Sequence, residues 1–214
     1  MNCCGHCRDA GDFFNERTAR RELKRYLRRG PEKPTRLLIE AISGEEVPGK
    51  TLLDIGGGIG AIQFELFKKD LSQSLNIDAS TAYQSVSKEE ASNRGVKEKA
   101  EYLFGDFTDL ASDLPKKDIV TLDKVICCYP DFQKLLQLSL QKCEGVYGLV
   151  YPRVNGVTKI GFSLINLWFR IRGSEFRIYL HSPITVDEII RENSFQKRSY
   201  KTTILWQVVV YERI

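Results

Sequence analysis

Residues 53–60 read LDIGGGIG, and this short stretch decides the fold of the chain. The apolar run 51–55 that leads into it predicts a buried strand, and the run 61–69 that follows predicts a helix. A glycine-rich turn between a strand and a helix lets the backbone approach a nucleotide closely. We therefore expect a ligand of the nucleotide type to bind at this turn.

Working outward from the turn, strands and helices continue to alternate. Further strands are predicted at 74–77, 101–104, 118–122 and 146–151, and further helices at 81–93 and 131–142. Short apolar strands that alternate with helices of 10 to 13 residues are typical of a parallel sheet whose crossover connections are right-handed. The pattern therefore predicts an α/β fold.

The two ends of the chain differ from this repeating centre. Helices are predicted at 13–29, 35–42 and 185–192, a long strand at 203–211, and a further short strand at 176–180. No internal repeat and no low-complexity linker divides the sequence. We expect an N-terminal helical arm over residues 1–47, which covers a main domain over residues 48–214.

Composition excludes several classes of protein. The chain has 214 residues, of which 28% are charged and 42% hydrophobic, as in ordinary globular domains. This composition excludes wholesale disorder, a collagen and a disulfide scaffold. No apolar run reaches the roughly 18–20 residues that a membrane span needs, and the N-terminus has no apolar signal segment. We expect a cytoplasmic protein without a transmembrane segment.

The cysteines support a reducing compartment. Cys127 and Cys128 are adjacent within an apolar run, where free cysteines usually behave as small buried hydrophobes. Cys3, Cys4, His6 and Cys7 form a separate group. These four residues could hold a metal, but a structural zinc site usually needs a second ligand pair, and none follows. We predict no metal site and interpret the group as a redox-sensitive tail, with zinc as the alternative.

Positive charge is concentrated at the N-terminus. Residues 1–36 carry ten Lys or Arg against five Asp or Glu, although the net charge of the whole chain is only +4. A solvated helix face is the simplest interpretation. The alternatives are a contact with nucleic acid, an acidic membrane surface or an acidic substrate. Only Tyr26 interleaves an aromatic ring with these charges, so a base-stacking surface is poorly supported.

Acidic residues near the glycine turn narrow the choice of ligand. The glycines alone also fit the dinucleotide pattern, which would indicate NAD. Asp54, however, places negative charge at the turn, which opposes a pyrophosphate and suits a cation. S-adenosylmethionine carries a sulfonium and an ammonium and no phosphate. Asp78 at the end of the second strand can accept hydrogen bonds from ribose hydroxyls, and Asp106 with Phe107 suits an adenine.

Four motifs together resemble those of the class I S-adenosylmethionine-dependent methyltransferases. They are LDIGGGIG at 53–60, NID at 76–78, GDF at 105–107 and DIV at 118–120. The similarity spans about residues 48–152 in the family's order. Within the superfamily, the chain resembles the small-molecule branch that includes ubiquinone/menaquinone and magnesium-protoporphyrin methyltransferases.

The resemblance implies a Rossmann-like three-layer sandwich. Its sheet would have seven strands, mostly parallel, with the last strand reversed. It also implies a set of cofactor-binding residues. They are Asp54, Gly56, Gly57, Gly58, Gly60, Asp78, Ala79, Asp106, Phe107 and Asp123.

Within this set the resemblance implies individual roles. The glycines would bring backbone to the methionine part, and Asp54 would orient its amino group through water. Asp78 would hold the ribose, and Asp106 with Phe107 the adenine. Asp123 would line the cofactor near its reactive end. The fourth strand is followed by DKVICCY at 123–129, and not by the Asn-Pro-Pro-Tyr element of enzymes that methylate amino groups. This departure weakens that reaction class.

The sequence indicates the catalytic and substrate-binding residues less clearly than the cofactor-binding residues. A base is needed only if the acceptor is protonated, and His181, Tyr129 and Asp123 are the candidates. Residues 152–175 form an inserted segment, either a helix packed into the domain or a lid with an apolar inner wall. Four arginines flank it and could pair with a substrate carboxylate. They are Arg153, Arg170, Arg172 and Arg177.

We therefore expect an enzyme that transfers a methyl group to a small, apolar or carboxylate-bearing molecule. Two alternatives stay open. The first is an RNA or protein methyltransferase that uses the basic arm, with nucleic acid as the less favoured partner. The second is a non-catalytic module that binds the nucleoside. The methyl acceptor and the oligomeric state are not specified by the sequence.

Overall fold

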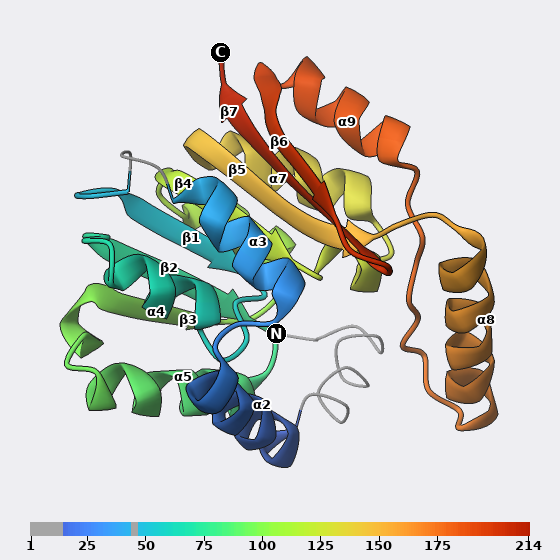
Figure 1. The fold of residues 1–214 in the computed structure, drawn as a ribbon, viewed down its shortest axis with the longest axis horizontal. Helices are drawn as coiled ribbons and strands as arrows, with labels where there is room; N and C mark the ends of the chain where they lie inside the picture. Colours follow the sequence, from blue (N-terminus) through green and yellow to red (C-terminus); the bar gives the residue numbers. More distant parts are fainter. Residues whose placement is uncertain (1–14, 44–46) are drawn as a thin grey trace.

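A single mixed sheet organises the protein. The structure is a computed structural model that describes residues 15–43 and 47–214. The strands are β1 (Thr51–Ile55), β2 (Gln73–Asp78), β3 (Ala100–Phe104), β4 (Lys117–Asp123), β5 (Cys143–Pro152), β6 (Phe195–Thr202) and β7 (Trp206–Arg213). They lie in the order β3-β2-β1-β4-β5-β7-β6 (Figure 1). The first five strands are parallel, and β7 is antiparallel to both β5 and β6. The predicted seven-stranded sheet with a reversed last strand is confirmed.

Helices cover both faces of the sheet and complete the three layers. The helices of the core are α3 (Lys33–Ile42), α4 (Ala61–Phe67), α5 (Thr81–Asn93), α6 (Phe107–Leu110), α7 (Phe132–Gln141) and α9 (Pro183–Glu192). Successive residues of β1 point to opposite faces, so Leu52 packs with α3 and α4 while Leu53 packs with α7 and α9. Burial on both faces explains why the central strands are continuous apolar runs.

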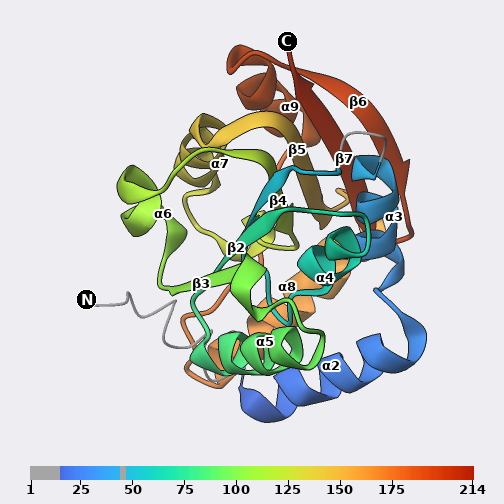
Figure 2. The same cartoon turned by 90° about the vertical axis from the view of Figure 1, so that its left-hand side faces the viewer.

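The N-terminal arm is divided between two roles. Its first helix, α2 (Glu16–Arg29), is capped by Asn15 and lies against α5, with Ala19 and Tyr26 buried (Figure 2). Its second helix, α3, is part of the layer over β5 and β7, because Leu38 and Ile42 join the core there. The arm is therefore packed onto the main domain along its described length.

The C-terminal region corrects two predictions. The strand predicted at 203–211 is wrong at its start, because β6 and β7 form a hairpin whose turn covers Thr203 to Leu205. The short strand predicted at 176–180 is absent, and those residues are irregular. The sequence analysis missed β6 altogether. This strand is at the sheet edge and reads FQKRSYKT, so it lacks the apolar alternation of a half-buried strand.

The inserted segment forms a helix that projects from the sheet. Helix α8 (Gly156–Ile171) lies beyond the ends of the strands, and an irregular chain returns from it to α9 (Figure 1). Asn166 anchors it to that return chain: its side chain donates to the Ile178 carbonyl at 2.8 Å and accepts from the Ile178 N–H at 2.9 Å. Among the described residues, no helix combines the length and the apolar character that crossing a bilayer requires.

Candidate active site

A pocket of about 550 Å³ opens at the carboxyl ends of the parallel strands. Ligands of open α/β sheets bind at this edge, where the strand order reverses between β1 and β4. Nine of the ten predicted cofactor residues line it, namely Asp54, Gly56, Gly57, Gly58, Asp78, Ala79, Asp106, Phe107 and Asp123. The structure therefore brings together residues that are far apart in the sequence.

The tenth residue, Gly60, has a different role from the other glycines. It caps α4 with a left-handed backbone, φ 81°. A Cβ atom there would lie 2.5 Å from Ser87 Oγ and 2.6 Å from Gln63 Nε2, both in a buried polar cluster. Gly60 does not line the pocket. The absence of a side chain at Gly60 lets α4 pack closely against α5. This packing holds the glycine turn in position from the side away from the pocket.

The other glycines shape the turn itself. Gly56 and Gly58 also have left-handed backbones, with φ of 65° and 54°, which favour glycine. A Cβ on Gly56 would lie 2.5 Å from Val125 Cγ2. A Cβ on Gly57 would lie 2.3 Å from Asn76 Nδ2 and 2.8 Å from Asp54 Oδ2. Space and backbone conformation together explain why these positions are glycine.

Asp54 places a buried carboxylate under the turn. Its Oδ1 accepts a hydrogen bond from Thr121 Oγ1 at 2.7 Å. Its Oδ2 is buried in the pocket lining and makes no hydrogen bond within the described part of the chain. Desolvation by burial, together with the nearby Asp123 and Asp78, raises the pKa of Asp54 to about 7, although the hydrogen bond from Thr121 acts in the opposite direction. An oxygen so placed is suited to a cationic ligand group.

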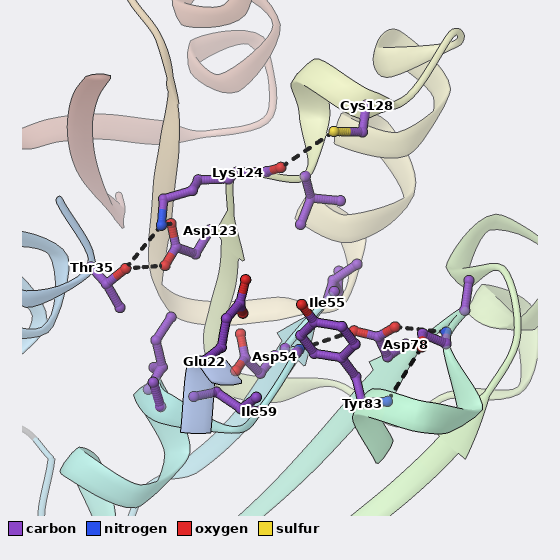
Figure 3. Close-up of a pocket in the computed structure, with 18 of the residues that line it drawn as sticks. Glu22, Thr35, Asp54, Ile55, Ile59, Asp78, Tyr83, Asp123, Lys124 and Cys128 are labelled. Atoms are coloured by element: carbon purple, nitrogen blue, oxygen red, sulfur yellow. Dashed lines mark hydrogen bonds and ion pairs between the residues drawn. The ribbon is translucent and has the colours of Figure 1, made fainter. Parts of the chain in front are cut away.

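Asp78 supports the turn from the adjacent strand (Figure 3). Its Oδ2 accepts from the Gly58 N–H at 3.0 Å, and its Oδ1 accepts from the Ser80 N–H at 2.7 Å. Burial raises its pKa, while these two backbone donors act in the opposite direction. The carboxylate thereby links the end of β2 to the glycine turn and also faces the pocket.

Asp106 and Tyr129 form a linked pair on another wall. The Tyr129 hydroxyl lies 2.8 Å from both Asp106 carboxylate oxygens, and Asp106 Oδ1 also accepts from the Thr108 N–H at 2.8 Å. Asp106 thus caps α6 at the end of β3. The candidate base Tyr129 is in the pocket lining, with its hydroxyl engaged by Asp106.

A cluster of charged groups, missed by the sequence analysis, surrounds Asp123. The carboxylate accepts from Thr35 Oγ1 at 2.5 Å, and Lys124 Nζ lies 3.9 Å from its other oxygen (Figure 3). Lys124 Nζ is also 2.6 Å from Glu32, a partner 92 residues earlier in the chain. Burial raises the pKa of Asp123. No local sequence pattern predicts this ion pair, because Glu32 belongs to the N-terminal arm and is far from Lys124 in the sequence.

The structure does not bring His181 into the pocket. Its Nε2 lies 2.8 Å from the Ile126 carbonyl, and its ring stacks on Phe132 with centroids 3.9 Å apart. The pKa of His181 is lowered by burial. These contacts give the ring a packing role, so the geometry does not favour His181 as the base.

Beyond the glycine turn, the pocket lining includes a set of apolar and sulfur-containing side chains. They are Cys127, Cys128, Leu135, Phe162, Phe176, Ile178 and Trp206. Phe162 comes from α8, so the inserted helix contributes one side chain to the lining. Arg153, Arg170, Arg172 and Arg177 are not among the lining residues. Within the described lining, the cations Arg25 and Lys124 are both ion-paired with Glu32.

The arm also contributes to the lining. Glu22, Arg25 and Tyr26 from α2 face the pocket, and the Tyr26 hydroxyl donates to Glu65 at 2.7 Å. Part of the arm's basic charge is neutralised, because Arg20 pairs with Glu16 and Glu89. The residues Cys3, Cys4, His6 and Cys7 lie outside the described part of the chain, as do Phe13 and Phe14. Within the described part, no cluster of metal-binding side chains is found.

Comparisons with known proteins agree with this geometry. Residues 53–141 match the family model described as methyltransferase domain. No curated protein matches the sequence. The fold is similar to magnesium protoporphyrin IX methyltransferase from Synechocystis PCC 6803, solved with bound SAM (S-adenosylmethionine). The TM-score is 0.76 at 14% identity, with 100% of each chain covered.

Two further solved structures share the fold. Geranyl diphosphate C-methyltransferase from Streptomyces coelicolor A3(2), solved with geranyl diphosphate, has a TM-score of 0.68 at 15% identity and covers 84% of this chain and 77% of its own. An O-methyltransferase family 2 protein from Planctomyces limnophilus, complexed with apigenin, has a TM-score of 0.67 at 17% identity and covers 93% of this chain and 62% of its own. Similarity at these identities concerns the fold.

Proposed function

We propose that the chain is an S-adenosylmethionine-dependent methyltransferase that acts on a small apolar molecule, since residues 53–141 match a methyltransferase domain model. One observation carries the choice of acceptor: the pocket that contains the polar glycine turn is also lined by large apolar side chains. An apolar acceptor would bury its surface against those side chains. The carboxylate-bearing alternative is less well supported, since the flanking arginines do not line the pocket and the two lining cations are already paired.

The residues present fit the methyl donor. Asp54 Oδ2, buried and without a hydrogen bond in the described part of the chain, would accept from the ammonium of its methionine part. A Cβ on Gly56 or Gly57 would clash with neighbouring side chains, and Gly58 has a left-handed backbone that favours glycine, so this turn would present backbone to the donor. Asp78 would accept from the ribose hydroxyls, beside Ala79, while Asp106 and Phe107 would contact the adenine. These assignments are residue roles that we propose for the donor when it is bound.

Methyl transfer depends mainly on the alignment of the acceptor with the donor. When bound, the donor would supply an electrophilic methyl carbon on a sulfonium, which the acceptor would attack in line. The chain's part is to hold the acceptor at that carbon and to exclude water, effects that together contribute several kcal/mol in order of magnitude. Phe162, Phe176 and Trp206 would position the acceptor, and α2 would cover the donor end of the pocket.

Asp123 is the base that the geometry favours for a protonated acceptor. It lies in the pocket, its Oδ1 makes no hydrogen bond in the described part of the chain, and its pKa is raised by burial. A raised pKa makes a carboxylate a better proton acceptor near neutral pH. Lys124 and Thr35 hold it in place.

We infer a cytoplasmic location from Cys127 and Cys143, which are buried free thiols.

The test uses S-adenosylmethionine labelled on its methyl group, with a metabolite extract as the source of acceptors. We expect label in small molecules that partition into an organic solvent. Phe162→Ala should raise KM for the acceptor and leave the affinity for S-adenosylhomocysteine unchanged. Ile184→Ala, on exposed α9, is the matched control. Label found only in RNA, in protein or in the aqueous fraction would overturn the proposed acceptor class.

A further inference from the structure

Helix α8 has an apolar face that nothing in the described chain covers. Its large side chains at the outer positions are 45–76% exposed, a stripe of Val157, Ile160, Leu164, Trp168 and Ile171. Their spacing of three and four residues puts them on one side of the helix. Exposure of this many large apolar side chains together is unusual for a protein surface and marks an interaction site.

The opposite side of α8 fixes the helix to the domain. Phe169 is buried and meets the Phe176 ring edge-on at 5.2 Å, and Asn166 makes its two hydrogen bonds to Ile178. Phe162, on the same side, lines the pocket. The outer stripe therefore cannot turn inward without breaking these contacts, so its exposure is built into the fold.

The charges beside the stripe have one sign. Residues 153–173 contain Arg153, Lys159, Arg170 and Arg172 and no Asp or Glu. Lys159 and Arg170 are three turns apart on one side of α8, about a quarter turn around the helix from the stripe, and both are exposed. Next to the stripe, the Arg172 guanidinium lies over the Trp168 ring at 4.3 Å. The charged side chains of this helix and its flanks are therefore all cationic.

The turn between β6 and β7 extends this surface. Ile204 is 78% and Leu205 41% exposed there. Arg153, just before α8, binds the turn through its N–H to the Leu205 carbonyl at 2.9 Å and through its guanidinium to the Thr203 carbonyl at 3.1 Å. The turn therefore lies beside the start of α8 and brings two more exposed apolar side chains there.

We propose that α8 and the β6–β7 turn bind the surface of an anionic lipid bilayer. An amphipathic helix with an exposed Trp, with cationic side chains and no acidic ones, lies in the interface between headgroups and acyl chains, and its charges attract anionic lipid. A second copy of the chain fits less well. In a symmetric pair, the same helix would face itself and place cations of like sign together without an acidic partner.

Vesicle co-sedimentation of the full chain tests this directly. We expect binding to vesicles of phosphatidylcholine with phosphatidylglycerol, weaker binding at high salt, and little binding to phosphatidylcholine alone. Ile160→Glu should weaken the partition coefficient by at least about tenfold. Ile214→Glu, equally exposed at the other end of the molecule, should leave it unchanged. Thermal unfolding checks that both variants fold.

Two further measurements distinguish binding to a lipid bilayer from binding to a second copy of the chain. Vesicles should shift the Trp fluorescence to shorter wavelength, and Trp168→Phe should remove that shift. Lys159→Gln combined with Arg170→Gln should remove the preference for anionic vesicles. The proposal is overturned if the wild-type chain does not sediment with anionic vesicles, or if Ile160→Glu binds as well as Ile214→Glu. A dimer that Ile160→Glu dissociates, without vesicle binding, would assign the surface to a second copy.

Discussion

Asp54 combines burial, charge and a free hydrogen-bonding position in one side chain. Its pKa of about 7 means that a large fraction of ligand-free molecules hold this carboxyl protonated near neutral pH. An ammonium brought against Oδ2 would favour the charged form and lower that pKa. Ligand binding would then release a proton, and the affinity would rise with pH until Asp54 is ionised in the free protein.

The first prediction follows from this linkage. Binding of S-adenosylhomocysteine at about pH 6.5 should release a fraction of a proton, and its affinity should increase from about pH 5 to about pH 7 and then level off. Titration calorimetry in two buffers of different ionisation enthalpy measures the release. Asp54→Asn should remove most of it, whereas Asp113→Asn, outside the pocket, should not. Equal release in wild type and Asp54→Asn would contradict the assignment.

The raised pKa of Asp54 also determines how the stability of the ligand-free protein changes with pH. The folded state holds the Asp54 proton more tightly than the unfolded chain does, because its pKa is raised. The stability of the folded state should therefore fall as pH rises from about 4 to about 7, and stay level above that. Chemical denaturation across this range should show a smaller fall for Asp54→Asn than for wild type. A parallel pH profile in the two proteins would refute the raised pKa.

Asp78 gives a prediction about affinity. A carboxylate that accepts from ribose hydroxyls makes charge-assisted hydrogen bonds worth about 1.5–3 kcal/mol. Asp78→Ala should therefore weaken binding of S-adenosylhomocysteine by roughly tenfold to 150-fold. The loss includes the contribution of the Gly58 and Ser80 contacts to the shape of the turn. Unchanged affinity in a folded variant would exclude the ribose role.

At the level of single residues, the sequence predicted some positions better than others. Asp54, Asp78 and Asp106 lie at or just beyond the carboxyl ends of the first three strands, so their meeting at one sheet edge follows from the parallel order. His181 was a candidate only because histidine is rare here, and its contacts with Ile126 and Phe132 belong to packing. Lys124 could not be predicted, because its partner Glu32 is brought there by the arm.

Among the elements, the glycine turn and α4 act as one unit. Gly58 and Gly60 both have left-handed backbones, but a Cβ on Gly58 would make only ordinary contact with Tyr83 at 3.5 Å. A Cβ on Gly60 would enter the buried Gln63 and Ser87 cluster. Gly60→Ala should therefore destabilise the protein more than Gly58→Ala, by about 1–3 kcal/mol. Denaturant unfolding of both variants measures the difference, and equal losses would contradict the tight packing.

The role of α2 as a cover leads to a prediction about dynamics. Because Glu22, Arg25 and Tyr26 line the pocket, a ligand held there should restrain the helix. Hydrogen exchange of the α2 amides should slow when S-adenosylhomocysteine binds, while exchange in the distant β6 stays unchanged. No slowing in α2 at saturating ligand would remove its role as a cover.

Elements in the centre of the sheet were easier to predict than those at its edge. Strands such as β4 are buried on both faces and are therefore recognisable as apolar runs. The edge strand β6 is largely polar, and its pairing with β7 depends on a turn that the sequence does not mark clearly. Helix α8 was expected from its apolar residues, but sequence could not show that most of its outer face stays exposed.

On the scale of the whole molecule, different regions of the chain contribute different parts of the pocket lining. The five parallel strands assemble the polar part of the pocket at their carboxyl ends. The arm contributes to the lining through α2, and α8 with its return chain contributes apolar side chains. In the proposed function, the acceptor would therefore contact parts of the chain outside the glycine-rich core. This division explains why the sequence indicates the methyl donor more clearly than the acceptor.

The central claim is that this pocket binds S-adenosylmethionine and not a dinucleotide. Calorimetric titration of the purified chain with S-adenosylhomocysteine, and separately with NAD, tests it most directly. At about pH 8, where Asp54 is largely ionised, we predict saturable, one-to-one binding of S-adenosylhomocysteine and no heat of binding from NAD, because the charged Asp54 repels a pyrophosphate at the turn. Binding of NAD together with no binding of S-adenosylhomocysteine or S-adenosylmethionine would contradict the account.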